Sequence, residues 1–257
     1  MSDELVRERQ GNVLVVRLNR PEARNALTPA ILEGIGEAIL EAESDPEIRV
    51  IVLTGTGDRA FCAGMDLRSF ASGEEMGVVN EEATAAYSRL FRGDVAVPLV
   101  GAANATAVAG GLELLLGCDV IVASSEAQFG LPEVKRGLFA AGGGTLIGTR
   151  IPLSIALEMT LTGESISAAR AYELGLVNAI VAPDEVLTTA LALAERIAGN
   201  GPLGLKATKE LVRLGVSDID AWSQRRDEWQ NIVFSSDDAK EGATAFVEKR
   251  NPVWRGH

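Results

Sequence analysis

The sequence has 257 residues, of which 47% are hydrophobic and 23% are charged, and this length and balance are typical of a globular protein with a full core. A formal net charge of −12 argues against general binding to nucleic acids or to anionic membrane surfaces, so we expect neither as a partner. No stretch reaches the roughly 18 apolar residues that a membrane-spanning helix needs.

Cysteine and histidine are both scarce, which limits the compartment and the chemistry. Two cysteines, Cys62 and Cys118, are too few for a disulfide framework, and together with the polar N-terminus they favour a cytoplasmic location. The only histidine is His257, so a Ser-His-Asp or Cys-His device would lack its base and a zinc site its usual ligands. We therefore expect no metal site, and acid–base chemistry falls to Glu, Asp, Lys, Tyr or Cys.

Strands and helices are predicted to alternate along the chain and then to give way to helices alone. Short apolar or β-branched runs predict strands over residues 5–9, 13–18, 50–53, 99–108, 120–123 and 176–181. Apolar residues at helical spacing predict helices over residues 29–43, 78–91, 145–150, 154–160, 168–174, 185–198, 203–214, 218–234 and 237–249. Thr28 and Ser167 stand where helix caps are expected. This order predicts an α/β core with a helical C-terminal portion.

A glycine-rich stretch, residues 137–148, does not fit a phosphate-binding loop. Its glycines do not follow the G-x-G-x-x-G register, and no Gly-Lys-Ser/Thr follows them. We interpret this stretch as closely packed backbone that leads into the next helix.

The residues around Gly110 and Gly111 predict an anion-binding turn. The two glycines follow one apolar run and open another, Leu112 to Leu116, which is the pattern of a strand, a tight turn and a helix. The first backbone N–H groups of a helix have no partner within the helix and lie at the positive end of its dipole, so an oxyanion can bind there. Glycine lets another molecule approach such a backbone closely.

Two carboxylates, Glu113 and Glu133, stand beside glycine-bearing turns. Leucines flank Glu113, and burying an ionised carboxylate is costly unless it is paired or its pKa rises. One interpretation is a catalytic carboxylate, and the other is an ordinary first-turn glutamate that reaches solvent. Glu133 follows Pro132, which by itself indicates only a helix start. Because both carboxylates occur in such places, the pair favours a catalytic role more than either residue does alone.

With these residues in view, the chain resembles the crotonase family, the enoyl-CoA hydratase/isomerase superfamily, over nearly its whole length. The motifs that carry the resemblance are L-N-R-P-E-A-R-N-A-L (18–27), A-F-C-A-G-M-D-L (60–67), A-G-G-L-E-L-L-L-G-C-D (109–119), F-G-L-P-E-V-K-R-G (129–137), A-A-G-G-G-T (140–145), L-T-G-E-S-I-S-A (161–168), G-L-V-N (175–178) and E-G-A-T-A-F-V-E-K-R (241–250). Together these motifs are highly specific, although no single one of them would be.

The resemblance implies an α/β fold in which a spiral of ββα units, residues 1–184, precedes a C-terminal helical region, residues 185–257, that forms trimer contacts. It implies assembly as a homotrimer or as a hexamer made of two trimers. The implied substrate is an acyl-CoA thioester. Coenzyme A enters as part of that substrate, so no separate cofactor is implied.

The resemblance also implies roles for individual residues. The oxyanion hole maps to the backbone N–H groups of Met65 and Gly110. Glu113 is implied to help activate a water molecule for attack at Cβ, while Glu133 holds the same water and exchanges a proton at Cα. Contacts with coenzyme A are implied for Arg24, Ala63, Asp66, Leu67 and Arg68, and for Phe246 and Lys249 of a neighbouring subunit.

Three features depart from the family pattern, the first of them a mild change, and the last two bear on substrate choice. Ala109 replaces a third glycine of the family pattern, Phe139-Ala140 stands where many hydratases have Ile-Pro, and the ending K-R-N-P-V-W-R-G-H resembles carnitinyl-CoA dehydratases. The leading hypothesis is an enoyl-CoA hydratase, a hydro-lyase that adds water reversibly and syn to a 2,3-unsaturated acyl-CoA. The alternatives are an enoyl-CoA isomerase that uses one glutamate, a carnitinyl-CoA dehydratase-like activity, and a non-catalytic acyl-CoA-binding protein.

Overall fold

The computed structural model of the chain describes residues 4–66 and 80–257. Leu67 and Arg68, which the resemblance implies as contacts of coenzyme A, lie outside the described residues. Within the described ranges, no helix combines the length and the apolar character needed to cross a membrane.

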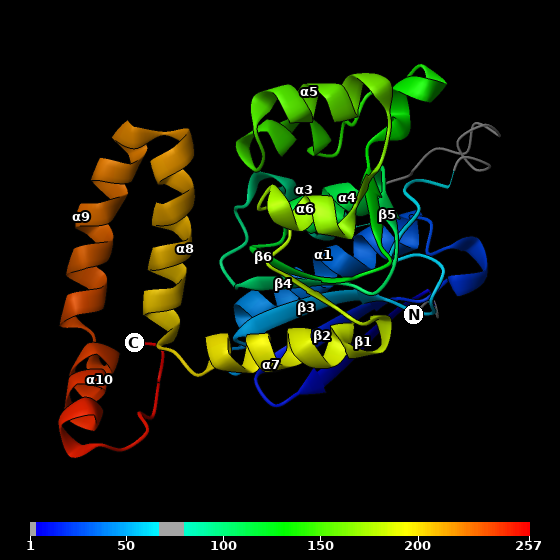
Figure 1. Cartoon of the computed structure of the whole chain (residues 1–257). Coiled ribbons are helices and arrows are strands. Elements are labelled where there is room, and N and C mark those ends of the chain that lie inside the picture. Colours follow the sequence, from blue (N-terminus) through cyan, green and yellow to red (C-terminus); the bar gives the residue numbers. More distant parts are fainter. Residues whose placement is uncertain (1–3, 67–79) are drawn as a thin grey trace.

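A six-stranded sheet forms the centre of the molecule (Figure 1). Its strands, in spatial order, are β1 (Leu5–Gln10), β2 (Val13–Leu18), β3 (Val50–Gly55), β4 (Leu99–Ala103), β6 (Val120–Ser124) and β9 (Ala179–Val181). The β1–β2 pair is antiparallel, as the sequence predicts, and every other neighbouring pair is parallel. Helical connections separate most of these parallel strands, because parallel neighbours cannot be joined by a tight turn.

Both faces of this sheet are covered, which explains the uninterrupted apolar run of β3. One set of alternating side chains, such as Val50 and Val52, packs against α7 (Val186–Ala198). The other set, such as Ile51 and Leu53, packs against α1 (Pro29–Ser44) and α4 (Gly110–Gly117) within a second apolar cluster. Figure 1 shows α7 on one side of the sheet and α1, α3 (Glu81–Arg92) and α4 on the other.

A smaller sheet lies beside α4 and carries one wall of the candidate site. Its strands are β5 (Ala107–Val108), β7 (Gln128–Gly130) and β8 (Ile166–Ser167), in the order β5-β7-β8. The described residues before α7 also form α5 (Leu153–Thr162), α6 (Ala168–Glu173) and the 3-10 helices Pro21–Ala23, Pro132–Arg136, Gly144–Thr149 and Pro183–Glu185.

The structure corrects three predicted elements. The strand expected over 99–108 is two strands in different sheets, because the Asn104 side chain accepts a hydrogen bond from the Gly55 N–H (3.1 Å) and donates one to the Gly57 carbonyl (2.7 Å), which turns the chain. The strand expected over 176–181 is only Ala179–Val181. The helix expected over 145–150 is a 3-10 helix that begins one residue earlier.

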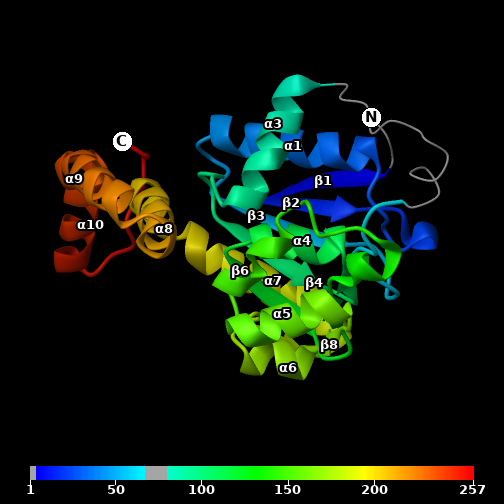
Figure 2. The ribbon, with the colours of Figure 1, turned by 90° about the horizontal axis from the view of Figure 1, so that it is seen from above.

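The last three helices form an arm that extends away from the sheet. We use "the arm" for α8 (Pro202–Ser217), α9 (Ile219–Ser235) and α10 (Asp237–Glu248), which Figures 1 and 2 show to one side of the other elements. By contrast α7, although it follows the expected boundary at residue 184, packs on the sheet. The division at residue 184 therefore stays a prediction, and packing alone groups α7 with the core.

Candidate active site

The candidate site is built around the start of α4, where Ala109 adopts an unusual backbone conformation. Its φ of 51° and ψ of −130° lie in a region that favours glycine, which is the residue that the family pattern has here. The turn is held from both sides, since the Ala109 N–H donates to the Gly130 carbonyl (2.9 Å) and the Ala109 carbonyl accepts from the Glu113 N–H (3.0 Å). The fold thus holds the Ala109 backbone in a strained conformation, which costs about 1–3 kcal/mol, next to Gly110.

A second segment, Cys62 to Met65, runs directly beside this turn. A Cβ added to Gly64 would lie 2.7 Å from the Ala109 Cβ and 3.2 Å from the Gly110 nitrogen, so only glycine permits the approach. Leu27 anchors the segment, because its N–H donates to the Gly64 carbonyl (2.8 Å) and its carbonyl accepts from the Asp66 N–H (3.2 Å).

Two backbone N–H groups in these neighbouring segments are left free. Among the described residues, neither the Met65 N–H nor the Gly110 N–H has a protein acceptor. Gly110 is also the first residue of α4, where helix N–H groups lack internal partners. Because Gly64, which precedes Met65, packs against the Gly110 nitrogen, these two donors are the candidates for binding an oxyanion.

Asn25 fixes the backbone leading into this segment, a role that the sequence analysis did not assign. Its side chain is fully buried, and its Oδ1 accepts from the Arg20 N–H (2.9 Å). Its Nδ2 donates to the carbonyls of Thr56 (3.0 Å) and Ala60 (2.9 Å). The signal that could have revealed this role is the L-N-R-P-E-A-R-N-A-L motif, whose polar residues stand between the predicted strand 13–18 and the predicted helix 29–43.

Glu113 is buried in the first turn of α4, with only 7% of its surface exposed. This burial favours the interpretation in which Glu113 faces the interior over the one in which it reaches bulk solvent. Its Oε1 accepts a hydrogen bond from the Gly144 N–H (2.9 Å). Burial raises the pKa of this carboxyl above the usual range, the nearby Glu133 charge raises it further, and the N–H groups of Gly144 and Gly142 oppose the rise.

The glycine-rich stretch explains how this carboxylate is held. A Cβ on Gly142 would lie 2.6 Å from the Glu113 Oε2, and one on Gly144 would lie 3.0 Å from its Oε1 and 2.5 Å from the Ala140 Cβ. Any side chain at either position would displace the carboxylate or the loop. The stretch is closely packed backbone, as predicted, but its packing partner is the Glu113 carboxylate.

Glu133 lies in the 3-10 helix Pro132–Arg136, near enough to Glu113 for the two charges to interact. Its Oε2 is buried and has no hydrogen-bond partner among the described residues. Burial raises the pKa of Glu133, while its own backbone N–H and the Arg136 charge oppose the rise. Two carboxyls with a raised pKa therefore share one site, and one of them has a buried oxygen without a partner among the described residues.

Two hollows adjoin this centre. A cavity of about 590 Å³ begins at Glu113 and extends between α4 and α8. Its apolar lining includes Phe91, Leu116, Leu146, Val212 and Val216. A hollow of about 320 Å³ is lined by Arg24, Arg59, Ala60, Ala63, Thr106 and Val108. The Met65 N–H and the Gly110 N–H belong to the two segments that border this second hollow.

The remaining residues named by the resemblance are only partly brought together. Arg24 and Ala63 share the smaller hollow, and the Ala63 N–H donates to the Arg24 carbonyl (3.1 Å). The Asp66 carboxylate forms an ion pair with Arg20 (3.4 Å). Phe246 and Lys249 lie in the arm, at and just after the end of α10, and Phe246 is 84% exposed. The chain does not bring these two residues to its own candidate site.

Comparisons with known proteins show the family and the fold of this chain. The family model for enoyl-CoA hydratase/isomerase matches residues 8–257. The enoyl-CoA hydratase EchA19 of Mycobacterium tuberculosis is 40% identical over 256 residues, which span 97% of this chain and 95% of that protein. A carnitinyl-CoA dehydratase of Salmonella arizonae is 37% identical over an alignment of 267 residues, gaps included, which covers both proteins completely. The crystal structure of an enoyl-CoA hydratase from Mycobacterium tuberculosis superposes with a TM-score of 0.91 at 42% identity over the whole of both chains.

The chain therefore belongs to the enoyl-CoA hydratase/isomerase family. Its fold is the α/β crotonase fold of these structural relatives. Among the described residues, no three His, Cys, Asp or Glu side chains gather in a way that could hold a metal ion.

Proposed function

We propose that this chain is an enoyl-CoA hydratase that adds water reversibly to a 2,3-unsaturated acyl-CoA thioester. The observation that carries the proposal is a pair of carboxyls beside two free backbone N–H groups. Glu113 is buried, Glu133 is half-buried, and the pKa of each is raised. A raised pKa lets one carboxyl act as a base while the other donates a proton near neutral pH. The family membership supports the same chemistry.

The proposed reaction uses the backbone donors first. The thioester oxygen accepts hydrogen bonds from the N–H groups of Met65 and Gly110, and these bonds strengthen as negative charge develops on that oxygen. Glu113 removes a proton from a water molecule, and the resulting hydroxyl bonds to Cβ. Glu133 helps to hold the same water through its buried Oε2 and supplies the proton that bonds to Cα. The net change is the addition of one water across the double bond.

The two hollows give room for the two halves of such a substrate. The apolar cavity that begins at Glu113 suits an acyl chain. The hollow with Arg24 and Ala63 carries positive charge at its rim, which suits the phosphates of coenzyme A. Because the reaction draws only on side chains and backbone N–H groups, coenzyme A is needed as part of the substrate and not as a separate cofactor.

Assembly is part of the proposal. Phe246 and Lys249 can approach a coenzyme A site only in a neighbouring subunit, and the arm leaves apolar side chains such as Phe234 exposed (78%). We therefore propose a homotrimer or a hexamer of two trimers. Sedimentation velocity of the intact chain should show one of these species, and a fully active monomer at assay concentration would contradict the proposal.

A carnitinyl-CoA dehydratase-like activity is the second candidate, because a dehydratase of that name spans this chain at 37% identity. An isomerase, which shifts the double bond with one glutamate, is a further possibility within the family. The two-carboxyl geometry favours hydration over isomerisation, because a bond shift needs no water.

A panel of CoA thioesters tests these candidates against one another. We expect loss of the conjugated enoyl absorbance when crotonyl-CoA and longer 2-enoyl-CoA thioesters are added, with formation of 3-hydroxyacyl-CoA. Hydration of crotonobetainyl-CoA in preference to these would favour the carnitinyl-CoA activity, and conversion of a 3-enoyl-CoA without hydration would favour the isomerase. Tight binding of all the thioesters with no turnover would indicate a non-catalytic binding protein.

A further inference from the structure

Helix α8 forms the side of the Glu113 cavity that faces α4. Leu205, Thr208, Val212 and Val216 all line the cavity from this helix. The position of α8 therefore decides how much room lies beyond Glu113. Any element that sets the position of α8 also sets the size of the substrate cavity.

Little of α8 is buried against the rest of the chain. Of its residues, all of which the structure describes, only Ala207 is buried, and its four leucines are half-buried. Val212 and Val216, which line the cavity, remain 66% and 74% exposed. Specific polar contacts therefore add to the apolar packing that sets the position of α8.

One set of contacts holds the middle of the helix to Asp119, which lies two residues after the end of α4. The Asp119 carboxylate binds the Lys209 Nζ (2.8 Å) through one oxygen and the Arg213 Nη2 (2.7 Å) through the other. The Lys209 Nζ also donates to the Val97 carbonyl (2.9 Å). Burial lowers the pKa of Lys209, and the charge and hydrogen bond of Asp119 oppose this shift.

The C-terminal tail, residues 251–257, holds the turn that precedes the helix. The Trp254 Nε1–H donates to the Gly199 carbonyl (2.8 Å), in the turn that joins α7 to α8. The Trp254 ring also lies on two glycines, since a Cβ on Gly242 would lie 3.1 Å from it and one on Gly201 3.6 Å. The tail thus connects α10 to the start of α8.

The tail itself is anchored in α10 by a buried carboxylate. Asp238 is 4% exposed, and its two oxygens accept hydrogen bonds from the N–H groups of Arg255 (2.7 Å) and Gly256 (2.9 Å). The Asp238 N–H donates in turn to the His257 carbonyl (3.2 Å). Three hydrogen bonds to Asp238 therefore attach residues 255–257 of the tail to α10.

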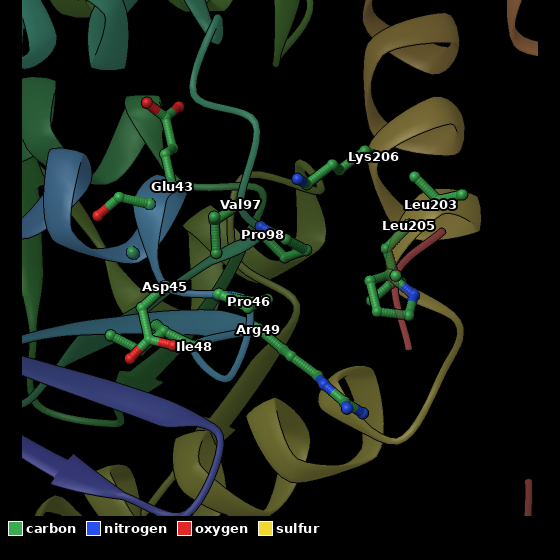
Figure 3. Close-up of a pocket in the computed structure, with 14 residues that line it drawn as sticks. Glu43, Asp45, Pro46, Ile48, Arg49, Val97, Pro98, Leu203, Leu205 and Lys206 are labelled. Atoms are coloured by element: carbon green, nitrogen blue, oxygen red, sulfur yellow. The ribbon is translucent and has the colours of Figure 1, made fainter. Parts of the chain in front are cut away.

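Space remains under the start of α8, so the helix can shift if the tail is released. A cavity of about 150 Å³ separates Leu203, Leu205 and Lys206 of α8 from the core residues Ile48 and Val97, and Gly256 of the tail lines it too. Figure 3 shows Lys206 extending from α8 toward the Val97–Pro98 segment across this gap.

We propose that the C-terminal tail is a strap that sets the position of α8, and through it the acyl-chain length that the substrate cavity accepts. Trp254 and Asp238 are then positioning residues, which act on the substrate without touching it. The identity of the ligand rests on the proposed function above. The strap itself rests on the contacts of Trp254, Asp238 and Asp119.

The test compares the binding of a short and a long CoA thioester to the full chain. Isothermal titration calorimetry gives Kd for acetyl-CoA and for decanoyl-CoA with the wild type, Trp254→Ala and the control Val253→Ala. Val253 is 68% exposed in the same tail. We expect Trp254→Ala to change the ratio of the two Kd values about tenfold, which is the effect of altered contact with roughly two methylene groups. We expect Val253→Ala to leave the ratio unchanged.

A milder variant keeps the test decisive if Trp254→Ala does not fold or assemble. Gly242→Ala retains the tryptophan but pushes its ring away, and we expect a change of ratio in the same direction of about threefold, close to the effect of one methylene group. Circular dichroism and sedimentation velocity must show the wild-type fold and assembly for each variant compared.

The outcomes separate this inference from the proposed function. An unchanged ratio in Trp254→Ala, an equal loss of affinity for both thioesters, or failure of both variants to fold would overturn the strap. Absence of binding of either thioester to the wild type would instead overturn the proposed function. Binding needs no turnover, so a wild type without hydratase activity leaves the strap open to this test.

Discussion

The candidate site and the arm differ in how much of their surface a single chain covers. At the site, Glu113 is 7% exposed and its leucine neighbours Leu112 and Leu114 are fully buried. In the arm, α9 has no buried residue, and Phe234 and Phe246 are 78% and 84% exposed. Apolar patches of that size on a protein surface usually indicate contacts with a partner.

This difference in covered surface separates residues that contacts within the chain hold in place from residues that such contacts leave exposed. The backbone donors and carboxyls of the site are positioned by contacts within the chain, such as those of Asn25, Leu27 and Gly144. The arm instead presents apolar side chains outward and connects to the core through Asp119 and the tail. We therefore propose that the site needs no partner for its reacting groups, whereas a partner covers the arm.

Truncation should have the largest effect on folding, activity and assembly. Two truncation points separate the contribution of α7 from that of the arm. We expect residues 1–184 to aggregate or to be inactive, because loss of α7 exposes the sheet face that Val186, Ala190 and Ala194 cover. We expect residues 1–200, which keep α7, to retain the strand signal in circular dichroism but to lose assembly in sedimentation velocity. A folded, active and monomeric product from residues 1–184 would contradict the assignment of α7 to the core.

Replacement of either carboxyl should give the next largest effect while leaving the arm untouched. We expect Glu113→Gln and Glu133→Gln each to lower kcat by more than about 10²-fold, the usual scale of positioned acid–base catalysis. The sole histidine is the last residue, so no imidazole stands in for either group. Steady-state hydration of crotonyl-CoA measures the loss, with Glu164→Gln as a control, because Glu164 forms an exposed ion pair with Lys135. Near-wild-type turnover in either site variant would remove that carboxyl from the mechanism.

Loss of the proposed oxyanion donor at Gly110 should lower kcat by a similar or smaller factor. Gly110→Pro removes the N–H, and loss of one such donor costs about 3 kcal/mol of transition-state stabilisation, or about 10²-fold in kcat. Binding of coenzyme A should persist, which calorimetry can measure. Gly110→Ala is the matched control, since it keeps the N–H, although its Cβ would lie 2.8 Å from the Leu27 Cδ1 and that side chain must move. A folded Gly110→Pro protein with full activity would exclude Gly110 as a donor.

The sequence predicted those features that depend on neighbouring residues. Thr28 and Ser167 cap α1 and α6 as expected, with their side chains accepting from the N–H groups of Ile31 (3.3 Å) and Arg170 (3.2 Å). The run 50–53 is a strand covered on both faces. Glu113 stood out as a carboxylate among leucines, and it is buried. Each of these signals lies within a few residues of the feature that it predicts.

The features that sequence analysis missed depend on residues far apart in the chain. Asn104 splits the expected strand 99–108 by binding Gly55 and Gly57, nearly fifty positions away. Gly142 and Gly144 hold the Glu113 carboxylate, and no local pattern links that loop to α4. The strain at Ala109 is likewise visible only in its backbone angles. In each case the identity of the partner is set by the fold and not by local sequence.

The smallest expected effect is on the pH dependence of stability. It compares a glutamate at the site, Glu113, with a glutamate in the arm, Glu241. Burial raises the pKa of Glu113 at the site, whereas hydrogen bonds from Arg250 and the Val253 N–H hold the pKa of Glu241, in the arm, at about 2. An unfolded glutamate has a pKa of about 4.5. The stability that protonated Glu113 contributes is therefore fully present below that value and is lost as the pH rises through the raised pKa of the folded state. For Glu241 the contribution is present above about 4.5 and is lost as the pH falls toward 2.

Two conservative variants therefore should show opposite pH dependence of stability. Relative to the wild type, Glu113→Gln should become more stable as the pH rises from acid to neutral, because it lacks the buried carboxylate that must ionise. Glu241→Gln should become less stable over the same change, because the wild type gains its contacts with Arg250 as Glu241 ionises. Denaturant unfolding at a series of pH values measures both differences. Parallel trends in the two variants would contradict the assignment of Glu113 to a water-excluded site, since both glutamates would then respond as solvent-screened groups.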